Sequence, residues 1–414
     1  MTIPEWLTKN YIQNVLHVYH KDLTIQIEKF NIKSAFGKGE NYGGYLTKIH
    51  VVYTSNNGEE QKENHFMCKT SYDDEDELAR EKMESYDFFN REMLLYEQIL
   101  PKLNDLLNEI DDTDRIFPTV FHVDYNKQVL IFEDLTVQGF VMADRLQRLD
   151  MDHIKLVLRK LSKMHATSAV FNERSSGCLE KYDRGFFNKY TDSYKSFFVN
   201  SLMACAHYLQ QLDDEDSRKY AEKMFKMKPY YMDIGKRCFE PNNGHINVLA
   251  HGDIWTNNMM FKYCLKTGKP IDVLLIDFQF SFWGSPTLDL HFFFNTSIKE
   301  PLRLHHQDEL FHIYYQDFVD TLKKLNYITY PIPSLEQFRL QAEQKRFYAF
   351  HSSIVVQPVM LNQDPTDADY NALMGEDDRA MRFKSRVYKN PVVQENLQNL
   401  LPIFDRRGLL EINQ

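Results

Sequence analysis

The residues best suited to chemistry lie in two short motifs in the second half of the chain. The first contains His251, Gly252 and Asp253, and Asn258 follows five residues after that aspartate. Nineteen residues after Asn258, an apolar run leads into Asp277. This pattern suits phosphoryl transfer, in which one carboxylate accepts a hydroxyl proton while other oxygen ligands hold Mg²⁺ against nucleotide phosphates. We therefore expect Asp253 to be the catalytic base and Asn258 and Asp277 to be the metal ligands.

A simpler explanation is that Asp253 and Asp277 cap turns at strand ends, as aspartates often do. The full set of His-x-Asp-x-x-x-x-Asn, a hydrophobic strand and a further Asp favours the catalytic interpretation, because it follows the catalytic-loop pattern of kinases. His251 is expected to support the loop by packing and hydrogen bonding. The sequence contains neither the Gly-x-Ser-x-Gly elbow of a hydrolase nor a His-Glu-x-x-His zinc helix.

These motifs need a partner region that binds phosphates, and the first hundred residues offer one. Residues 46–53 and 63–70 are rich in β-branched and aromatic side chains, with an Asn-Gly turn signal at 56–58, so they predict a hairpin. The glycine-rich segment 36–45 precedes it. Such segments let backbone N–H groups approach phosphate oxygens. The glycine spacing is neither Gly-x-Gly-x-x-Gly nor a Walker loop, so by itself it also fits an ordinary turn.

Lys69 lies at the end of the second hairpin strand and has a candidate partner on the next predicted helix. Residues 88–103 carry an apolar stripe at helical spacing, and Glu92 is its only charge. A carboxylate on a face that packs into the core is costly unless it is paired. We therefore expect Lys69 to be the counter-ion of Glu92, and a lysine held in this way can be aimed at a phosphate.

Two further elements are clear from the pattern of apolar residues. Residues 129–132 form a buried-strand run that ends at Glu133, and residues 150–171 predict an amphipathic helix. His165 lies on the apolar face of that helix, where a hydrogen-bonded core histidine is the expected role. The segment 172–245 predicts aromatic, charged helices without a recognisable site.

Composition limits the compartment and the class of partner. The 414 residues include 49 basic and 59 acidic side chains, which gives a net charge of −10. This charge disfavours nucleic acids and anionic membranes as partners, because phosphate-rich surfaces attract clustered lysine and arginine. No stretch approaches the ~18 apolar residues of a membrane span, and the polar N-terminus is not typical of a signal peptide. The five cysteines are far apart and lack a Cys-x-x-Cys pair, so we expect a reduced, cytoplasmic protein.

The chain as a whole resembles the ecdysteroid kinase-like family, whose relatives include choline kinases and aminoglycoside phosphotransferases. The sequences that carry the resemblance are HGDIWTNNMMF and LLIDFQFSFWGSPTLDLHFFF, together with GKGENYGGY, FNREMLLYEQILPKL, VLIFEDL and LRKLSKMHATS. They resemble, in turn, the family's catalytic loop, metal motif, nucleotide loop, paired-glutamate helix, interlobe hinge and helix ending in His-Ala. Lys69 occupies the place of the family's strand lysine, and Glu92 that of its paired glutamate.

The resemblance implies an α+β, bilobal protein-kinase-like fold. The small β-rich N-lobe would span residues 1–132 and the large, mainly helical C-lobe residues 133–414, with ATP between them. In the nucleotide loop, the resemblance implies that Gly39, Asn41 and Gly43 bind the nucleotide. Tyr42 departs from the strict glycine pattern, so the phosphate-contacting amides are left open.

The resemblance also assigns roles around the hinge and the catalytic loop. The adenine would meet the backbone from Glu133 to Leu135, and Asp289 would brace the catalytic loop. Gly252 replaces the arginine of His-Arg-Asp in protein kinases, and Gln279 replaces the glycine of Asp-Phe-Gly. Both departures fit kinases of small molecules and argue against protein substrates.

The implied reaction is ATP- and Mg²⁺-dependent phosphorylation of a small-molecule hydroxyl, with ecdysteroids as the leading acceptor class. An aromatic content of 14% is compatible with apolar pocket walls, and the segments 186–198, 230–239 and 347–360 are the expected location. A choline- or ethanolamine-type acceptor is the first alternative, because aromatic rings and carboxylates bind quaternary ammonium groups. An aminoglycoside is the second, given the acidic stretch 364–378. A ligand-binding pseudokinase is the alternative from another class. Protein partners are left open.

Overall fold

The protein is described by a computed structural model of residues 3–35, 45–55, 58, 60–71, 85–364, 366 and 368–412. The chain folds as two compact units. Unit 1 consists of residues 1–101 and 117–141, and unit 2 of residues 102–116 and 142–414. Unit 1 is rich in β-sheet and unit 2 is mainly helical, as expected for a bilobal, kinase-like α+β fold. The chain passes between the two units more than once. Residues 102–116 belong to unit 2, the chain then returns to unit 1, and it enters unit 2 again after Val141.

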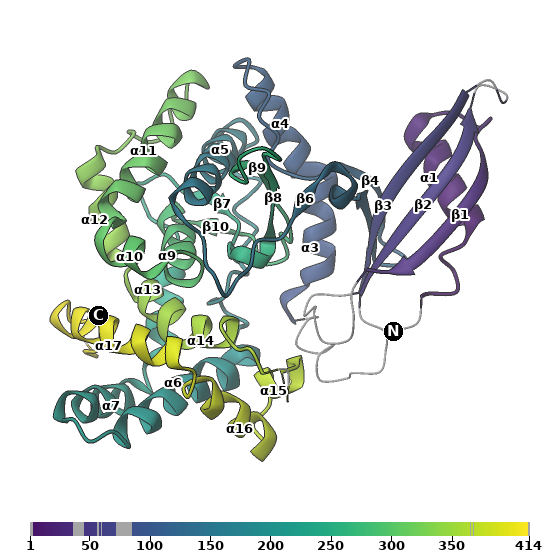
Figure 1. The fold of residues 1–414 in the computed structure, drawn as a ribbon. Coiled ribbons are helices and arrows are strands. Elements are labelled where there is room, and N and C mark those ends of the chain that lie inside the picture. Colours follow the sequence, from purple (N-terminus) through teal and green to yellow (C-terminus); the bar gives the residue numbers. More distant parts are fainter. Residues whose placement is uncertain are drawn as a thin grey trace. The chain divides into compact units, whose positions relative to one another are not determined.

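Unit 1 is built on an antiparallel sheet with the strand order β1-β2-β3-β5-β4 (Figure 1). Its strands are β1 (Gln26–Ser34), β2 (Tyr45–Ser55), β3 (Glu60–Thr70), β4 (Val120–Asp124) and β5 (Val129–Glu133), followed by η3 (Leu135–Gln138) and β6 (Phe140–Val141). The expected hairpin is therefore confirmed as β2 and β3, although residues 56, 57 and 59 of its turn lie outside the described residues.

A hydrophobic core cluster lies on one face of this sheet. Helix α1 (Lys9–His20) packs against β1 and β4 and buries Ile12, Val15 and Leu16. Side chains alternate between the two faces of a strand, and the alternate residues Ile49 and Val51 of β2 belong to this core. By the same alternation the even-numbered residues of β2 and the odd-numbered residues of β3 project from the opposite face.

One long helix follows β3. It consists of α3 (Phe88–Leu94), a π-helical stretch η2 (Leu95–Ile99) and α4 (Leu100–Asn108). The expected helix at 88–103 is thus confirmed and is five residues longer at its C-terminal end. Glu92 lies on the buried side of α3, as the stripe of apolar residues indicated.

Unit 2 consists mainly of helices, drawn from teal to yellow in Figure 1, and its described residues also include four short strands. Its first helices are α5 (Met151–Arg174), α6 (Lys195–Gln210), α7 (Glu215–Met227), α8 (Tyr231–Phe239) and α9 (Pro286–Thr296). The later helices are α10 (Glu300–His305), α11 (Gln307–Lys324), α12 (Leu335–Gln344), α13 (Phe347–His351), α14 (Gln357–Met360), α15 (Tyr370–Met374), α16 (Asp378–Val387) and α17 (Pro391–Arg406). The strands are β7 (Val248–Ala250), β8 (Met259–Tyr263), β9 (Pro270–Leu275) and β10 (Phe282–Gly284), and short helical turns are η4 (Thr191–Tyr194), η5 (Thr256–Asn258) and η6 (Ser352–Val356).

Helix α5 is the central support of unit 2. The Asp150 side chain caps its N-terminus by accepting a hydrogen bond from the His153 amide, and the helix packs against α11, β7 and β9. The expected helix at 150–171 is confirmed. Nowhere in the described part of the chain is a helix both long and apolar enough to cross a bilayer.

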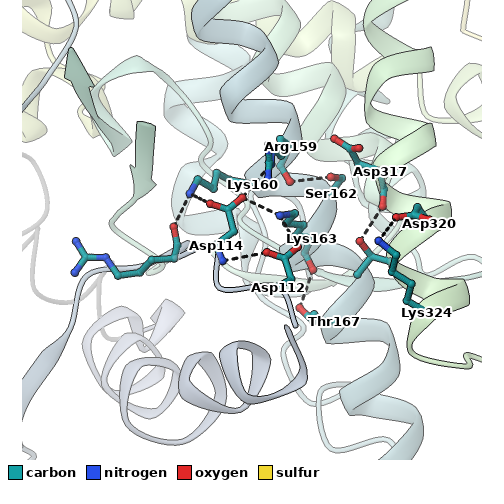
Figure 2. A network of polar contacts seen from close by, with 12 residues as sticks. Asp112, Asp114, Arg159, Lys160, Ser162, Lys163, Thr167, Asp317, Asp320 and Lys324 are labelled. Carbon is teal, nitrogen blue, oxygen red and sulfur yellow. Dashed lines mark hydrogen bonds and ion pairs between the residues drawn. The ribbon is translucent and has the colours of Figure 1, made fainter. Parts of the chain in front are cut away.

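An ion network ties the segment 102–116 to α5 (Figure 2). Lys163 bonds both Asp112 and Asp114, and Lys160 bonds Asp114 and, at 2.9 Å, Asp272 of β9. Burial by itself raises the pKa of Asp114, but the hydrogen bonds and charges of the two lysines outweigh it and lower this pKa to about 2. This network could not be predicted from the sequence, because its members are far apart in the chain.

Candidate active site

The loop after β7 carries the expected catalytic residues in a conformation that depends on glycine. Gly252 has a φ of +84°, and a Cβ atom at this position would lie 2.1 Å from the carbonyl oxygen of Phe280. Any other residue would therefore combine a strained backbone with a collision against main chain that cannot yield easily. This requirement explains why glycine stands between His251 and Asp253.

His251 holds the loop from inside. Its side chain is fully buried, and its Nε2–H donates to the carbonyl oxygen of Ile276 at 3.0 Å. Its Nδ1 is then left to accept the backbone N–H of Asp253 at 3.4 Å, and its ring packs against Phe278 at 4.6 Å. Burial lowers the pKa of His251, which keeps the imidazole neutral. Because both nitrogens are engaged, the ring is suited to a supporting role.

Asp289, in the first turn of α9, fixes the same loop from the other side. Its Oδ2 accepts the backbone N–H of His251 at 2.6 Å, and its Oδ1 accepts that of Gly252 at 2.9 Å. Its Oδ2 also accepts the Nε2–H of His165 at 3.0 Å, and the His165 Nδ1 accepts the hydroxyl of Tyr314 at 2.7 Å. His165 is thus a core histidine, as expected, and it connects α11 through α5 to the catalytic loop.

Tyr314 was not identified from the sequence. It lies in the segment 300–345, which predicts only supporting helices, and a buried tyrosine on such a helix looks like ordinary core. The general rule that a buried tyrosine hydroxyl usually has a hydrogen-bond partner is the feature that could have pointed to Tyr314.

Asp253 is almost fully buried and is held by Asn258. The Asn258 Nδ2 donates to the Asp253 side chain and to its backbone carbonyl, each at 2.8 Å. The pKa of Asp253 is raised to about 8. Burial is the main cause, the charges of Asp277 and Asp289 act in the same direction, and the hydrogen bond from Asn258 opposes them. Since both Nδ2 protons are used within the loop, the amide oxygen of Asn258 is the group that can ligate a cation.

Asp277 follows β9 and has a φ of +66°, a left-handed conformation that aspartate tolerates better than most residues. The backbone N–H of Ile276 donates to the Asn258 carbonyl at 3.0 Å, which ties the two candidate ligand segments together. A carboxylate and an amide oxygen are hard donors, and such donors suit Mg²⁺ better than a softer transition metal. The residues present therefore fit the metal that the sequence predicts.

Unit 1 contains the expected buried ion pair. The Lys69 ammonium lies 2.6 Å from the Glu92 carboxylate, with side-chain exposures of 8% and 1%. Lys69 faces Leu46 on β2 and Leu130 on β5 in the sheet register. The pairing of Lys69 with Glu92 is confirmed, whereas its role in nucleotide binding stays a prediction.

The expected adenine-binding segment forms a compact turn after β5. The backbone N–H of Glu133 donates to the Thr119 carbonyl at 3.0 Å, so this N–H is used within unit 1. The Asp134 side chain accepts the Thr136 backbone N–H at 3.0 Å and pairs with Lys48 at 3.4 Å. Leu135 is buried at the start of η3. These contacts hold the turn within unit 1.

The expected site residues fall into three groups, according to where the chain places them. Unit 2 brings together one set: His251, Asp253, Asn258, Asp277 and Asp289. Unit 1 holds a second set: Lys69, Glu92, Glu133 and Leu135. Three nucleotide-loop residues, Gly39, Asn41 and Gly43, lie outside the described residues.

The three segments expected to hold an acceptor pocket pack against one another in unit 2. The Phe187 ring lies 6.3 Å from that of Tyr231 and 6.0 Å from that of Phe347, and Tyr231 contacts Phe347 at 5.3 Å, all between ring centroids. Phe186 stacks on Phe280 at 4.4 Å, and Phe280 is the residue whose carbonyl abuts Gly252. The aromatic cluster therefore extends to the catalytic loop.

Tyr348 is the member of this cluster most suited to chemistry. Its side chain is 1% exposed, and among the described residues its hydroxyl has no hydrogen-bond partner. Burial raises the pKa of Tyr348 well above its usual value, and the negative charge of Asp253 adds to this effect.

Comparison with known proteins gives one family. The model described as the ecdysteroid kinase-like family matches residues 38–327, which is more than half of the chain and includes the catalytic loop, the metal motif and the Lys69–Glu92 pair. Comparison with curated proteins gave no match.

Proposed function

Because this chain belongs to the ecdysteroid kinase-like family, we propose that it transfers the γ-phosphoryl group of ATP to a hydroxyl of a small molecule. In this reaction the acceptor oxygen forms a bond to the γ-phosphorus while the bond to the ADP oxygen breaks. The acceptor proton passes to a base, and ADP leaves. The catalysis required of the protein is mostly positioning and neutralisation of charge.

The observation that carries the proposal is the bracing of Asp253. The base of such a reaction must be fixed in place, and Asp253 is held by Asn258 while Asp289 holds the backbone before it. A pKa of about 8 means that Asp253 needs help to be ionised at neutral pH. Mg²⁺ held by Asn258 and Asp277 would neutralise phosphate charge and offset the negative charge of Asp277.

Lys69 is the proposed phosphate ligand of unit 1. Glu92 fixes the ammonium group at 2.6 Å, so little side-chain entropy remains to be lost when a phosphate binds. The carbonyl of Glu133 and the backbone of Leu135 are the proposed adenine contacts. Gly39, Asn41 and Gly43 remain the proposed contacts of the nucleotide loop.

An ecdysteroid-like apolar alcohol is the acceptor that we favour. The aromatic cluster next to the catalytic loop suits an apolar ring system, and the Tyr348 hydroxyl could bond the acceptor oxygen. Choline- or ethanolamine-type acceptors stay as the alternative. An aminoglycoside is less favoured as acceptor. Asp364 pairs with Arg386 and Asp369 with Arg379, so less negative charge of the stretch 364–378 remains to attract a polycation. A cytoplasmic location is part of the proposal, supported by five unpaired cysteines.

The test is ADP release with Mg²⁺ over a panel of 20-hydroxyecdysone, related steroids, choline, ethanolamine and aminoglycosides. We expect one acceptor class to stimulate ADP release, and Asp253→Asn to lower the rate by about 10²-fold or more while the protein still binds ATP. ATP binding without stimulated ADP release would indicate a pseudokinase. Equal rates from the Asp253→Asn variant would refute the catalytic assignment.

A further inference from the structure

A second group of chemically suited side chains lies on the face of the unit 1 sheet that carries Lys69. His50 on β2 faces His65 on β3 in the antiparallel register. Glu63 lies two residues before His65, so it projects from the same face of β3. Neither the sequence motifs nor the proposed kinase reaction uses these three residues.

The three side chains converge on one point. The Nε2 atoms of His50 and His65 lie 2.7 and 3.2 Å from the same Glu63 oxygen, Oε1. The two imidazole rings stack with centroids 4.5 Å apart and an interplanar angle of 12°. All three potential ligand atoms lie within 4.8 Å of one another, and the described part of the chain contains no other such trio of histidine, cysteine or carboxylate ligands.

Two imidazole nitrogens and one carboxylate oxygen form a ligand set typical of a zinc site with an open position for water. Bonds of about 2.0–2.1 Å to a tetrahedral ion would place the ligand atoms roughly 3.3 Å apart. Side-chain exposures of 30% for His50, 34% for His65 and 58% for Glu63 leave room for the small rotations this needs. Mg²⁺ would not compete strongly, because it prefers oxygen ligands.

Asn31 on β1 contacts the ring nitrogen of His50 that does not face Glu63. Its Nδ2 lies 3.5 Å from the Nδ1 of His50. When a metal binds at Nε2 the proton moves to Nδ1, and a rotated Asn31 amide then presents its oxygen as the acceptor. Such a contact fixes the ring tautomer that a metal ligand requires.

We propose that His50, Glu63 and His65 bind one zinc ion on the exposed face of β2 and β3, with water completing its coordination. The ion replaces the protons that the two imidazoles now share with Glu63. Because it is held from both strands, it ties β2 to β3 and stabilises unit 1. The zinc proposal does not rest on the proposed kinase reaction.

The test is equilibrium dialysis of the full-length, metal-free protein against Zn²⁺ in the presence of excess Mg²⁺. We expect one Zn²⁺ per chain, and a loss of affinity of at least about tenfold in His50→Gln, His65→Gln and Glu63→Gln. Co²⁺ in place of Zn²⁺ should give the intense visible absorption of a four-coordinate site, which the variants lose. Zn²⁺ should also raise the melting temperature of the parent protein but not of the variants.

A matched control is His306→Gln, which removes an exposed histidine paired with a single carboxylate, Glu309, at 2.9 Å. This variant should bind Zn²⁺ as the parent does. The proposal is overturned if the parent binds no Zn²⁺, or if binding persists unchanged in the His50→Gln/His65→Gln double variant. Circular dichroism of each variant without metal checks that it is folded, and Glu63→Gln provides the test if a histidine variant is not.

Discussion

The Asp289→Asn substitution tests the central support of the candidate active site. Asp289 accepts two backbone N–H bonds, from His251 and Gly252, and a third bond from His165. In asparagine one of the two acceptor oxygens becomes an NH₂ group, so whichever way the amide turns, a donor faces a donor. The loss of one charge-assisted hydrogen bond in a buried site costs about 1.5–3 kcal/mol.

This cost has a direct consequence for the opening of the loop. A free-energy change of about 1.5–3 kcal/mol corresponds to a change of about 10- to 150-fold in an opening equilibrium. The amides of His251 and Gly252 should therefore exchange with deuterium faster by that factor in Asp289→Asn, measured by mass spectrometry on the peptide that spans 249–253. Asp152→Asn, which removes a half-exposed carboxylate bonded to Lys269 at 2.9 Å, is the control and should leave exchange unchanged. Equal protection in Asp289→Asn and the parent would refute the bracing role.

The same substitution has a second readout, once an acceptor is known. The charge of Asp289 contributes to the raised pKa of Asp253, after burial and the charge of Asp277. Its removal lowers the pKa of Asp253, and because a base must be ionised, the acid limb of the rate profile should move to lower pH. The plateau rate should fall, since the loop is less well held. A limb that moves to higher pH would contradict this account.

Three further substitutions test other parts of the molecule. Lys69→Met should abolish measurable ATP affinity in calorimetry and cost about 3–5 kcal/mol of unfolding free energy, because Glu92 loses its buried counter-ion; unchanged affinity would contradict the nucleotide role. Asp114→Asn should remove about 1–2 kcal/mol of unfolding free energy, after solvent screening, that the parent has above about pH 4 and loses as pH falls through the folded pKa of about 2. Denaturant unfolding across this pH range measures the difference, and a variant with the parent's acid sensitivity would argue against it. Tyr348→Phe should leave ATP binding intact and lower kcat/KM for the acceptor by about tenfold, the value of one hydrogen bond; an unchanged acceptor kcat/KM would rule out a contact with substrate.

Much of the local structure could be predicted from the sequence. The β-branched and aromatic residues and the Asn-Gly turn signal predicted the β2–β3 hairpin, and helical spacing of apolar residues predicted α5, because both signals are local properties of the chain. The ion pair of Lys69 and Glu92 followed from a physical necessity, since a carboxylate on a buried stripe needs a partner. Asp253, Asn258 and Asp277 could be proposed as site residues because phosphoryl transfer requires a carboxylate base and oxygen ligands for Mg²⁺.

Only part of what holds these residues could be expected from the sequence. The family resemblance implied that Asp289 braces the catalytic loop, but nothing in the sequence linked it to His165 and Tyr314. Asp289, His165 and Tyr314 come from three helices far apart in the chain, and only the packing of α9, α5 and α11 joins them into one support. The need for glycine at position 252 likewise appears only when the Phe280 carbonyl is seen 2.1 Å from the place of its Cβ.

The sequence by itself thus determined which groups could do chemistry and which segments form strands and helices, because residue type and periodicity are local properties. The tertiary structure decided which groups meet. The cross-strand trio of His50, Glu63 and His65 depends on a register in which one residue of slip would send the side chains to opposite faces. The raised pKa of Asp253 also depends on folding, since burial and the charge of Asp277 act only after distant parts of the chain are brought together.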